Sequence, residues 1–436
     1  MILLAILFIL VPSFAVGADI NCTGSNDHVL FNNAISAARD GVIITVAPGT
    51  CSFGSTVNLG SSKGVSIIGA GYDYTAIKGG GFSINGGATK RYRISGFNMS
   101  NGIKITGSSK YSSGGGWRID HNKFTTDGVS TFSRTYGVID HNLFQASTYF
   151  GAFIGGDPLG GPSYGWSAWA EDPWANGGVD SVFIEDNQYD FGCMTYPIST
   201  SITDGRNGSR YTFRYNTVKN AAWGSHDAEI NGFRGTQQAA IYGNTFIYTD
   251  ICSGGTYTRY TDLHRGGTGL IYNNQVKYKG SFFNPPYVFF LQTSTQRWGT
   301  TCDSTPEKIC SIGPGRSCAV DADCTSGGGG TCTWTMDGQE DSTGWPCRDQ
   351  VGVGQDNPAS GKQIKMPWYV WGNTYCTGSE NCAPTTTARV TLDTDVIVEG
   401  RDVIYSLKPG YTEYTYPHPL TRWQLQPNPP TDIYVK

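Results

Sequence analysis

The sequence predicts an all-β protein of the single-stranded right-handed parallel β-helix class, a solenoid in which every coil adds one rung. The main observation is a recurring hexapeptide with a central asparagine, which has an apolar residue three positions before it and another two positions after it. An asparagine at a strand-to-turn junction tolerates left-handed geometry, and stacked copies can cap one another. Three consecutive intervals are 29, 28 and 30 residues long, which suits one coil. The copies are centred on Asn122, Asn142, Asn187, Asn216, Asn244, Asn274 and Asn373.

The composition agrees with a rod built from short strands. Glycine accounts for 59 of 436 residues, aromatic residues for 13% and charged residues for only 15%, and short apolar runs alternate with Gly, Ser, Thr and Asn. Because a solenoid grows by adding coils, we expect one long domain despite the length of the chain. The net charge of −4 argues against a nucleic-acid binder with a generally basic surface. An acidic partner would have to meet a local basic patch.

The first 18 residues read as a signal peptide. Residues 2–11 are an apolar run, followed by Pro12 and small residues up to Ala18, so residues 19–436 would form the β-helix domain. The run has no preceding Lys or Arg, and an uncleaved anchor stays open as the alternative, although the run is short for a membrane span. All twelve cysteines follow Ala18. We therefore expect a secreted protein, extracellular or at the cell surface, and not an integral membrane protein.

A short helix should precede the first coils. Asn26 is a plausible cap, and apolar residues then recur at helical spacing until Gly41. Such a helix would cover the open end of the coil stack, where apolar interior and strand edges are otherwise exposed. At the other end, residues 411–420 are expected to seal the last coil. The simplest disulfide pairs outside the cysteine cluster described below are Cys22 with Cys51, Cys193 with Cys252, and Cys376 with Cys382.

The N-terminal coils resemble a known superfamily. Residues 34–53, AISAARDGVIITVAPGTCSF, followed by residues 65–79, VSIIGAGYDYTAIKG, are similar to the entrance of pectate-lyase-like right-handed β-helices. The resemblance covers roughly residues 27–420. It implies the fold and leaves the activity open, because this scaffold carries lyases, hydrolases, esterases and adhesins. The segment from Trp117 to His121 resembles a pectate-lyase strand, but its Asp-His pair recurs at Asp140-His141, which indicates a structural role in the turn.

Two segments interrupt the coil pattern. Residues 149–174 are rich in aromatic residues, among them Trp166 and Trp169, which could stack on sugar rings or form a satellite core beneath the loop. Residues 302–347 hold six cysteines and almost no aliphatic residues, which predicts an insertion stapled by disulfides. Zinc is disfavoured there, because the segment has no histidine and no repeated Cys-x-x-Cys.

A candidate site emerges when the coils are aligned on their asparagines. Ten residues before Asn216, Asn244 and Asn274 stand Arg206, Arg234 and His264, with Arg265 next in line. If the local loops have equal length, these side chains stack rung upon rung and form a ridge for an anion. The alternative is a solvated face in which Asp204 and Asp262, both two positions earlier, pair with the cations.

Phe233-Arg234 and the following residues up to Asn244 resemble the catalytic-arginine segment of the alginate-lyase and chondroitinase-B family. The resemblance implies Arg234 as proton donor, a lysine one coil earlier as base, and calcium that neutralises the uronate. This chain has Arg206 in place of the lysine and lacks the paired glutamates, so calcium stays in doubt and no metal ligands are assigned. His226, with Asp227 and Glu229 beside it, could supply the missing acid and base.

The sequence thus assigns catalytic roles to Arg234, His226, Arg206 and His264, and substrate-binding roles to Arg265, Asp262, Asp227, Glu229, Trp166 and Trp169. The expected function is binding, with cleavage by β-elimination, of an acidic extracellular polysaccharide, since clustered Arg and His can neutralise a carboxylate and move protons. The alternative is a non-catalytic structural, fibre or adhesin-type β-helix protein. Whether the chain is an enzyme is left open by the sequence.

Overall fold

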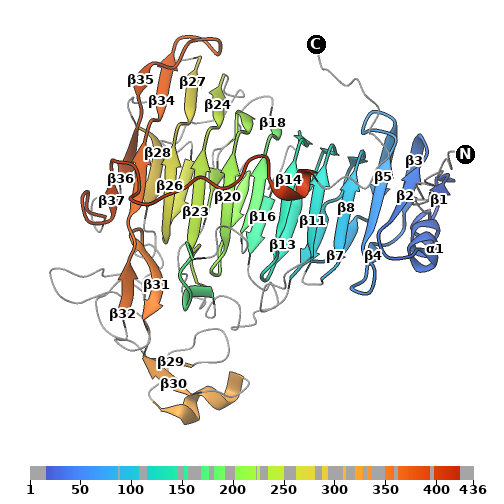
Figure 1. Ribbon diagram of the computed structural model, residues 1–436, viewed down its shortest axis with the longest axis horizontal. Coiled ribbons are helices and arrows are strands. Elements are labelled where there is room, and N and C mark those ends of the chain that lie inside the picture. Colours follow the sequence, from blue (N-terminus) through green and yellow to red (C-terminus); the bar gives the residue numbers. More distant parts are fainter. Residues whose placement is uncertain are drawn as a thin grey trace, which may run out of the picture.

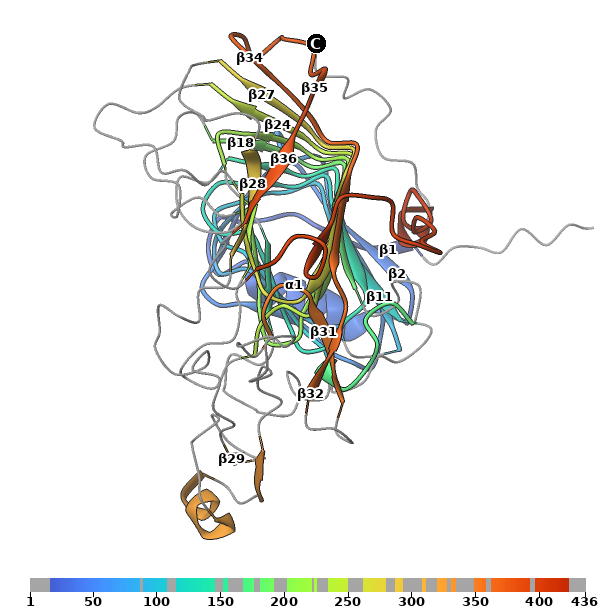
Figure 2. The same ribbon diagram turned by 90° about the vertical axis from the view of Figure 1, so that its left-hand side faces the viewer.

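Within the part of the chain described here, the strands stack into three parallel sheets, which confirms the predicted parallel β-helix (Figure 1). Figure 2 looks along the rod from its C-terminal end and shows the strands of each sheet superposed. The computed structural model describes residues 16–86, 89–107, 115–145, 152–155, 168–175, 181–191, 202–221, 223–225, 234–249, 262–279, 287–292, 308–310, 320–327, 331–334, 349–357, 362–392 and 397–422.

The first sheet runs the length of the rod, and its strands pair in parallel. In order along the rod they are β1 (Val16–Ile20), β2 (Val42–Val46), β5 (Val65–Gly69), β8 (Arg91–Ser95), β11 (Gly116–Asp120), β14 (Gly137–Asp140), β17 (Val182–Glu185), β20 (Arg210–Arg214), β23 (Gln238–Tyr242), β26 (Thr268–Tyr272), β33 (Trp368–Trp371) and β37 (Val403–Ile404).

The second sheet follows the asparagine turn in each coil. Its strands are β3 (Gly49–Phe53), β6 (Thr75–Gly79), β9 (Asn98–Met99), β12 (Lys123–Phe124), β15 (Leu143–Phe144), β18 (Gln188–Asp190), β21 (Thr217–Lys219), β24 (Thr245–Tyr248), β27 (Gln275–Tyr278), β34 (Thr374–Thr377) and β35 (Thr386–Thr387), the last of which pairs antiparallel.

The third sheet has two parts that a single bridge joins, between Gly205 and Ser225. The first part holds β4 (Val57–Leu59), β7 (Phe82–Asn85), β10 (Ile103–Thr106), β13 (Val129–Phe132), β16 (Ala152–Gly155) and β19 (Thr203–Gly205). The second part holds β22 (Trp223–Gly224), β25 (Asp262–Arg265), β28 (Tyr287–Gln292) and β36 (Arg389–Leu392).

Successive residues of each strand point alternately into the rod and away from it. Trp117 and Ile119 of β11 face the core, while Arg118 and Asp120 face outward. Because the coils are in register, like side chains stack: the rings of Phe124 and Phe144 lie 4.9 Å apart, centre to centre. The core is thus a set of parallel columns of apolar side chains, which no coil could bury alone.

The asparagine ladder is continuous through all seven copies. The Nδ2 group of each asparagine donates to Oδ1 of the next at 2.9–3.2 Å, and the same Oδ1 accepts the backbone N–H of the preceding asparagine. The predicted stacking of Asn216, Asn244 and Asn274 is confirmed. Asn274 bonds directly to Asn373 across a sequence separation of 99, so the intervening chain adds no coil to the ladder.

The left-handed residue of the turn was assigned to the wrong position. The positive φ belongs to the residue before the asparagine, for example 53° at His121 and 54° at His141. The asparagine itself is needed for its amide, because Nδ2 also donates to the carbonyl two residues back, as from Asn122 to Asp120 O. The side chain therefore supplies hydrogen-bond partners for backbone groups of the turn.

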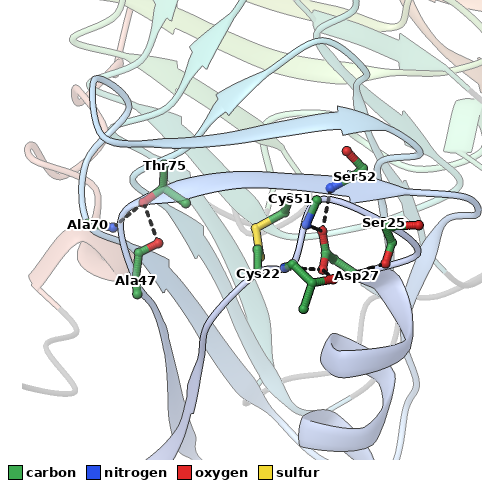
Figure 3. The surroundings of a disulfide bond; sticks show 10 residues. Cys22, Ser25, Asp27, Ala47, Cys51, Ser52, Ala70 and Thr75 are labelled. Atoms are coloured by element: carbon green, nitrogen blue, oxygen red, sulfur yellow. Dashed lines mark hydrogen bonds between the residues drawn. A yellow bond between two sulfur atoms is a disulfide. The ribbon is translucent and has the colours of Figure 1, made fainter.

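The N-terminal cap forms as predicted, with one correction. Helix α1 (His28–Ala37) buries Phe31 against Phe53, at 4.9 Å between ring centres. The residue at its N-cap position is Asp27 and not Asn26. The Asp27 carboxylate accepts the backbone N–H groups of Thr23 and Gly24 and that of Ser52, beside the Cys22–Cys51 disulfide (Figure 3). These bonds fasten the cap to the first coil.

The C-terminal tail does not seal the far end, contrary to expectation. Residues 405–422, here called the strap, run back along the outer face of the first sheet and end in η2 (Pro419–Arg422) beside β11 and β14 (Figure 1). Arg118 donates to Thr421 O at 3.0 Å, and Arg214 donates to the carbonyls of Tyr414 and Thr415 at 2.8 Å. Buried outward-facing arginines need acceptors, and the backbone of the strap supplies them.

The cysteine predictions are confirmed where the described residues test them. Cys22–Cys51 and Cys376–Cys382 are bonded, and Cys324 and Cys332 of the insertion are in disulfides. Cys193 and Cys252 lie outside the described residues, as does most of the insertion. Its described parts are β29 (Lys308–Cys310), which pairs antiparallel with β30 (Cys332–Trp334), and η1 (Asp321–Gly327).

Two further findings concern the predicted signal peptide and membrane-spanning helices. Strand β1 begins at Val16, before the predicted cleavage point after Ala18, and residues 1–15 lie outside the described part. No helix among the described residues is both long enough and apolar enough to span a membrane.

Candidate functional site

A row of outward positions on the third sheet brings two of the predicted residues together. Gly205 is bridged to Ser225, and Gly224 pairs with Leu263, so the parallel register aligns Ser225 with His264. The next outward position is therefore occupied by Arg206, directly after β19, and by Arg265, the last residue of β25. Arg265 pairs onward with Gln292. The sheet thus places both arginines in one row.

The two arginines stand two rungs apart, which corresponds to roughly 9.6 Å along the rod, because neighbouring strands lie about 4.8 Å apart. Both side chains are half-buried. Arg265 donates from Nε to the carbonyl of Ser225 at 3.0 Å, which holds its guanidinium against the strand. The rod therefore carries a local pair of cations in a protein whose net charge is −4. We call this pair the arginine row.

Arg234 does not belong to the arginine row, which corrects the alignment by offset from the asparagines. Its backbone lies against Asn207, whose N–H donates to Arg234 O at 2.6 Å. The N–H groups of Gln237 and Gln238 both donate to the carbonyl of Ser209, which marks a bulge in the chain before β23. Eight residues also intervene between Ser225 and Arg234. The loops of the three coils are therefore unequal, and the assumption of equal length was wrong.

Arg234 is buried in a closed ionic cluster. Its Nε and Nη2 atoms bond both oxygens of Asp349 at 2.7 Å, and Nη1 and Nη2 bond both oxygens of Asp356 at 2.9 and 2.8 Å. The guanidinium carbon also lies 4.8 Å from the centre of the Trp169 ring. Although burial opposes it, the two carboxylates raise the pKa of Arg234 above its ordinary value. A guanidinium held this way does not face a ligand at the surface.

The cluster fastens a hairpin to the rod. Asp349 precedes β31 (Val353–Asn357), which pairs antiparallel with β32 (Lys362–Lys365) and carries Asp356. Gln363 of β32 donates to both carboxylates, at 2.8 and 3.0 Å. One arginine against two aspartates leaves a net charge of −1, which the Gln363 amide and the N–H of Gly235 help to solvate. The cluster thus holds the hairpin against the rod at the point where the chain rejoins the coils after the insertion.

Sequence reasoning missed Asp349, Asp356 and Gln363 as partners of Arg234. The two aspartates lie 115 and 122 residues further along the chain. They belong to no repeat, and the cysteine-rich insertion separates them from the coil they contact. No local spacing could have connected them.

Trp169 is fully buried and donates from its indole nitrogen to Gly235 O at 3.2 Å. Of the two alternatives for the aromatic loop, this residue therefore fits the satellite core, and its ring is not open at the surface. Trp166 lies outside the described residues.

His264 points into the rod. It is fully buried, its Nδ1 lies 2.7 Å from Oγ of Ser225, and its ring meets Trp368 edge to face at 4.3 Å. Burial lowers the pKa of His264 well below its ordinary value, so the ring is neutral. The His264 side chain is therefore separated from the arginine row by the sheet itself.

The remaining predicted residues are placed in part or not at all. Asp262 pairs with Trp223 through the backbone at the start of β25, and its side chain lies outside the described part of the structure. Asp204 lies one position before the Gly205–Ser225 bridge, whereas Asp262 pairs with Trp223, which lies two positions before Ser225. The two aspartates are therefore in different rows. His226, Asp227 and Glu229 lie outside the described residues.

The first sheet offers no comparable open face where the strap lies on it. His418 of the strap is buried between the rings of Tyr136 and Phe183, and its backbone N–H donates to Oε1 of Glu185 at 2.8 Å. Burial, with the nearby charges of Arg214 and Arg118, lowers the pKa of His418 to about 3. The neutral ring accepts the N–H of Leu420 at 3.2 Å.

We expect this histidine to make the protein less stable in acid. Between about pH 6.5 and 3 the unfolded chain binds a proton that the folded His418 rejects, so stability falls as the pH falls. Lowering the pH from 7 to 4 should reduce the unfolding free energy of the native protein by about 2 to 3 kcal/mol more than that of a His418→Phe variant. Glu185, whose pKa burial raises, acts in the opposite direction in both proteins. Urea unfolding at several pH values measures the difference; parallel curves for the two proteins would contradict it.

No group of three or more His, Cys, Asp or Glu side chains within the described ranges is arranged to hold a metal ion. A comparison with protein-family models finds no match, and neither does a comparison with curated proteins. The site must therefore be interpreted from its own geometry.

Proposed function

We propose that the protein binds an acidic extracellular polysaccharide along the outer face of the third sheet. The observation that carries this proposal is the arginine row, in which Arg206 and Arg265 repeat along the rod axis on parallel, in-register strands. A polymer that lies along the rod meets cations at a fixed spacing, as a polyuronate requires. The disulfides Cys22–Cys51 and Cys376–Cys382 support a secreted protein, because such bonds persist in oxidising compartments.

Cleavage of the bound polymer by β-elimination is the further step of this proposal. The reaction needs a cation at the uronate carboxylate, a base for the C5 proton and an acid for the leaving oxygen. Arg206 and Arg265 suit the first task. His226, the residue that follows Ser225 in sequence, is the proposed base that takes the C5 proton, and Asp227 or Glu229 beside it is the proposed acid that protonates the leaving oxygen. The resemblance to the alginate-lyase and chondroitinase-B family supports the reaction type and not this choice of base, and Arg234 is no longer proposed as the proton donor because both its edges are occupied.

The second candidate is a non-catalytic β-helix protein of the fibre or adhesin type. The burial of Arg234 and His264 favours it, since Arg234 fastens the hairpin to the rod and His264 lies in the rod interior, so two of the four residues proposed for catalysis have structural roles. In this case the arginine row binds the polymer, and no bond is broken.

We expect Arg206→Ala and Arg265→Ala each to weaken binding of a polyuronate by roughly ten-fold to a hundred-fold, because a charge-assisted pair contributes about 1.5 to 3 kcal/mol. Binding to alginate, pectate and chondroitin is measured by calorimetry. The absorbance of a new unsaturated sugar end reports cleavage. Arg91→Ala, at the exposed first residue of β8 in the first sheet, is the matched control.

Three outcomes separate the candidates. Binding with absorbance, lost in both row variants, supports the lyase. Binding without absorbance supports the non-catalytic protein. If none of the three polymers binds, or if the Arg91 control loses as much affinity as the row variants, the arginine row is not the polysaccharide site.

A further inference from the structure

The outer face of the third sheet continues beyond the arginine row, toward the N-terminal end of the rod, over β13, β10 and β7 (Figure 1). The residues of β10 that face away from the core, Lys104 and Thr106, are exposed, and Phe132 at the end of β13 is half-buried. Ile105, which faces inward between the first two, is fully buried. This part of the face therefore presents a cation, a hydroxyl group and part of an aromatic ring.

The register places Phe132 in line with the arginine row. Phe132 pairs with Gly155, and Ile154 pairs with Gly205 on the next rung. The residues that follow these two, Gly155 and Arg206, therefore lie side by side. Phe132 thus stands two rungs before Arg206, which is the interval that separates the two arginines and corresponds to roughly 9.6 Å. A ring and two cations recur at equal intervals along the rod.

Lys104 adds a further cation at the ring. Its Nζ atom lies 5.1 Å from the centre of the Phe132 ring. A ring beside a cation suits an acidic sugar, because the C–H groups of a pyranose pack on the ring while the carboxylate pairs with the cation. Asp204, which shares the outward row of Lys104, is only 7% exposed. It stands three rungs away, at roughly 14 Å, beyond the screening length of about 8 Å at physiological salt.

We propose that Lys104 and Phe132 form a further subsite for the acidic polysaccharide, so that one extended chain contacts the rod from β13 to β25. This inference rests on the proposed function of the arginine row. One sugar unit of an extended chain is about as long as the spacing between rungs, so about five units reach from Phe132 to Arg265. Because the arginines stand on every second rung, the site fits a polymer that turns a carboxylate toward the sheet on every second sugar.

Oligosaccharides of defined length test the subsite. Trimers and hexamers of galacturonate and of mannuronate are titrated into the full-length protein and followed by calorimetry. A trimer spans the two arginines, whereas a hexamer also reaches Phe132 and Lys104. The hexamer should therefore bind roughly ten-fold more tightly, as expected for one aromatic and one exposed ionic contact.

Variants at the subsite are needed because a longer chain also gains affinity from its additional binding registers. Lys104→Ala and Phe132→Leu should each lower the ratio of hexamer to trimer affinity by roughly three-fold to ten-fold. Leucine keeps apolar volume at this half-buried position without the ring. Phe132→Tyr, which keeps the ring, should preserve the ratio. Lys78→Ala is the matched control, because it removes an exposed lysine of β6 in the second sheet and should leave the ratio unchanged.

The outcomes separate the subsite from the proposed function. An unchanged ratio in both Lys104→Ala and Phe132→Leu would overturn the subsite, even where Arg206→Ala abolishes binding and the function holds. An equal fall in the Lys78→Ala control would reveal a general effect of charge and overturn the subsite as well. If neither length binds, the polysaccharide function fails and the subsite fails with it.

Discussion

Replacing Arg234 by alanine will destabilise the protein by about 3 to 5 kcal/mol, because removing one partner from a buried ion pair leaves the other charge uncompensated. Here two buried carboxylates, Asp349 and Asp356, lose their common cation at once. Either the two carboxylates take up protons, or the hairpin separates from the rod so that water can reach them. Urea unfolding monitored by tryptophan fluorescence measures the loss.

Two variants show whether the cluster acts as described. Arg389→Ala removes an exposed cation 3.4 Å from Glu399 and should cost no more than about 1 kcal/mol. Asp356→Asn removes the excess negative charge of the cluster and should cost less than Arg234→Ala. Equal losses for Arg234→Ala and Arg389→Ala would show that the buried cluster contributes nothing particular to stability.

Asn216→Ala should also lower the unfolding free energy by roughly 3 to 5 kcal/mol. The side chain donates to the carbonyls of Ile184 and Arg214 and to Asn244, and it accepts two hydrogen bonds from Asn187. Alanine leaves several of these buried groups without a partner, at about 1 to 3 kcal/mol each before relaxation. Thermal and urea unfolding measure the effect, and circular dichroism checks that the strands persist.

The last asparagine of the ladder provides the matched control. Asn373 accepts from Asn274 and donates to Ile271 O, but it has no further ladder asparagine beyond it in the described chain. Asn373→Ala should therefore cost clearly less than Asn216→Ala. The ladder interpretation fails if the two substitutions cost the same, or if the internal one is neutral.

The candidate site could be predicted only in part. Arg206 and Arg265 were both named from the alignment on the ladder asparagines, but that alignment paired Arg206 with His264, and the register instead places Arg265, one residue later, in the row of Arg206. The same arithmetic failed for Arg234 and His264, because a bulge at Gln237 and unequal loops shift the coils against each other. Counting residues from a ladder predicts adjacency only across strands, where the spacing is rigid, and not across loops, where it is free.

The repeat pattern was sufficient for the rod. Each asparagine and its flanking apolar residues specify one turn and one inward column through contacts within the hexapeptide and with the next copy, so a single sequence carries that information. The amphipathic segment around Phe31 likewise predicts the cap from its own periodicity. Only the tertiary structure decided that Arg234 is closed by Asp349 and Asp356, and that the strap lies along the first sheet. These contacts join segments more than a hundred residues apart that share no period. A charged side chain is buried only where an oppositely charged or hydrogen-bonding partner lies next to it. Here those partners are placed by the path of the chain after the insertion and by the path of the C-terminal tail.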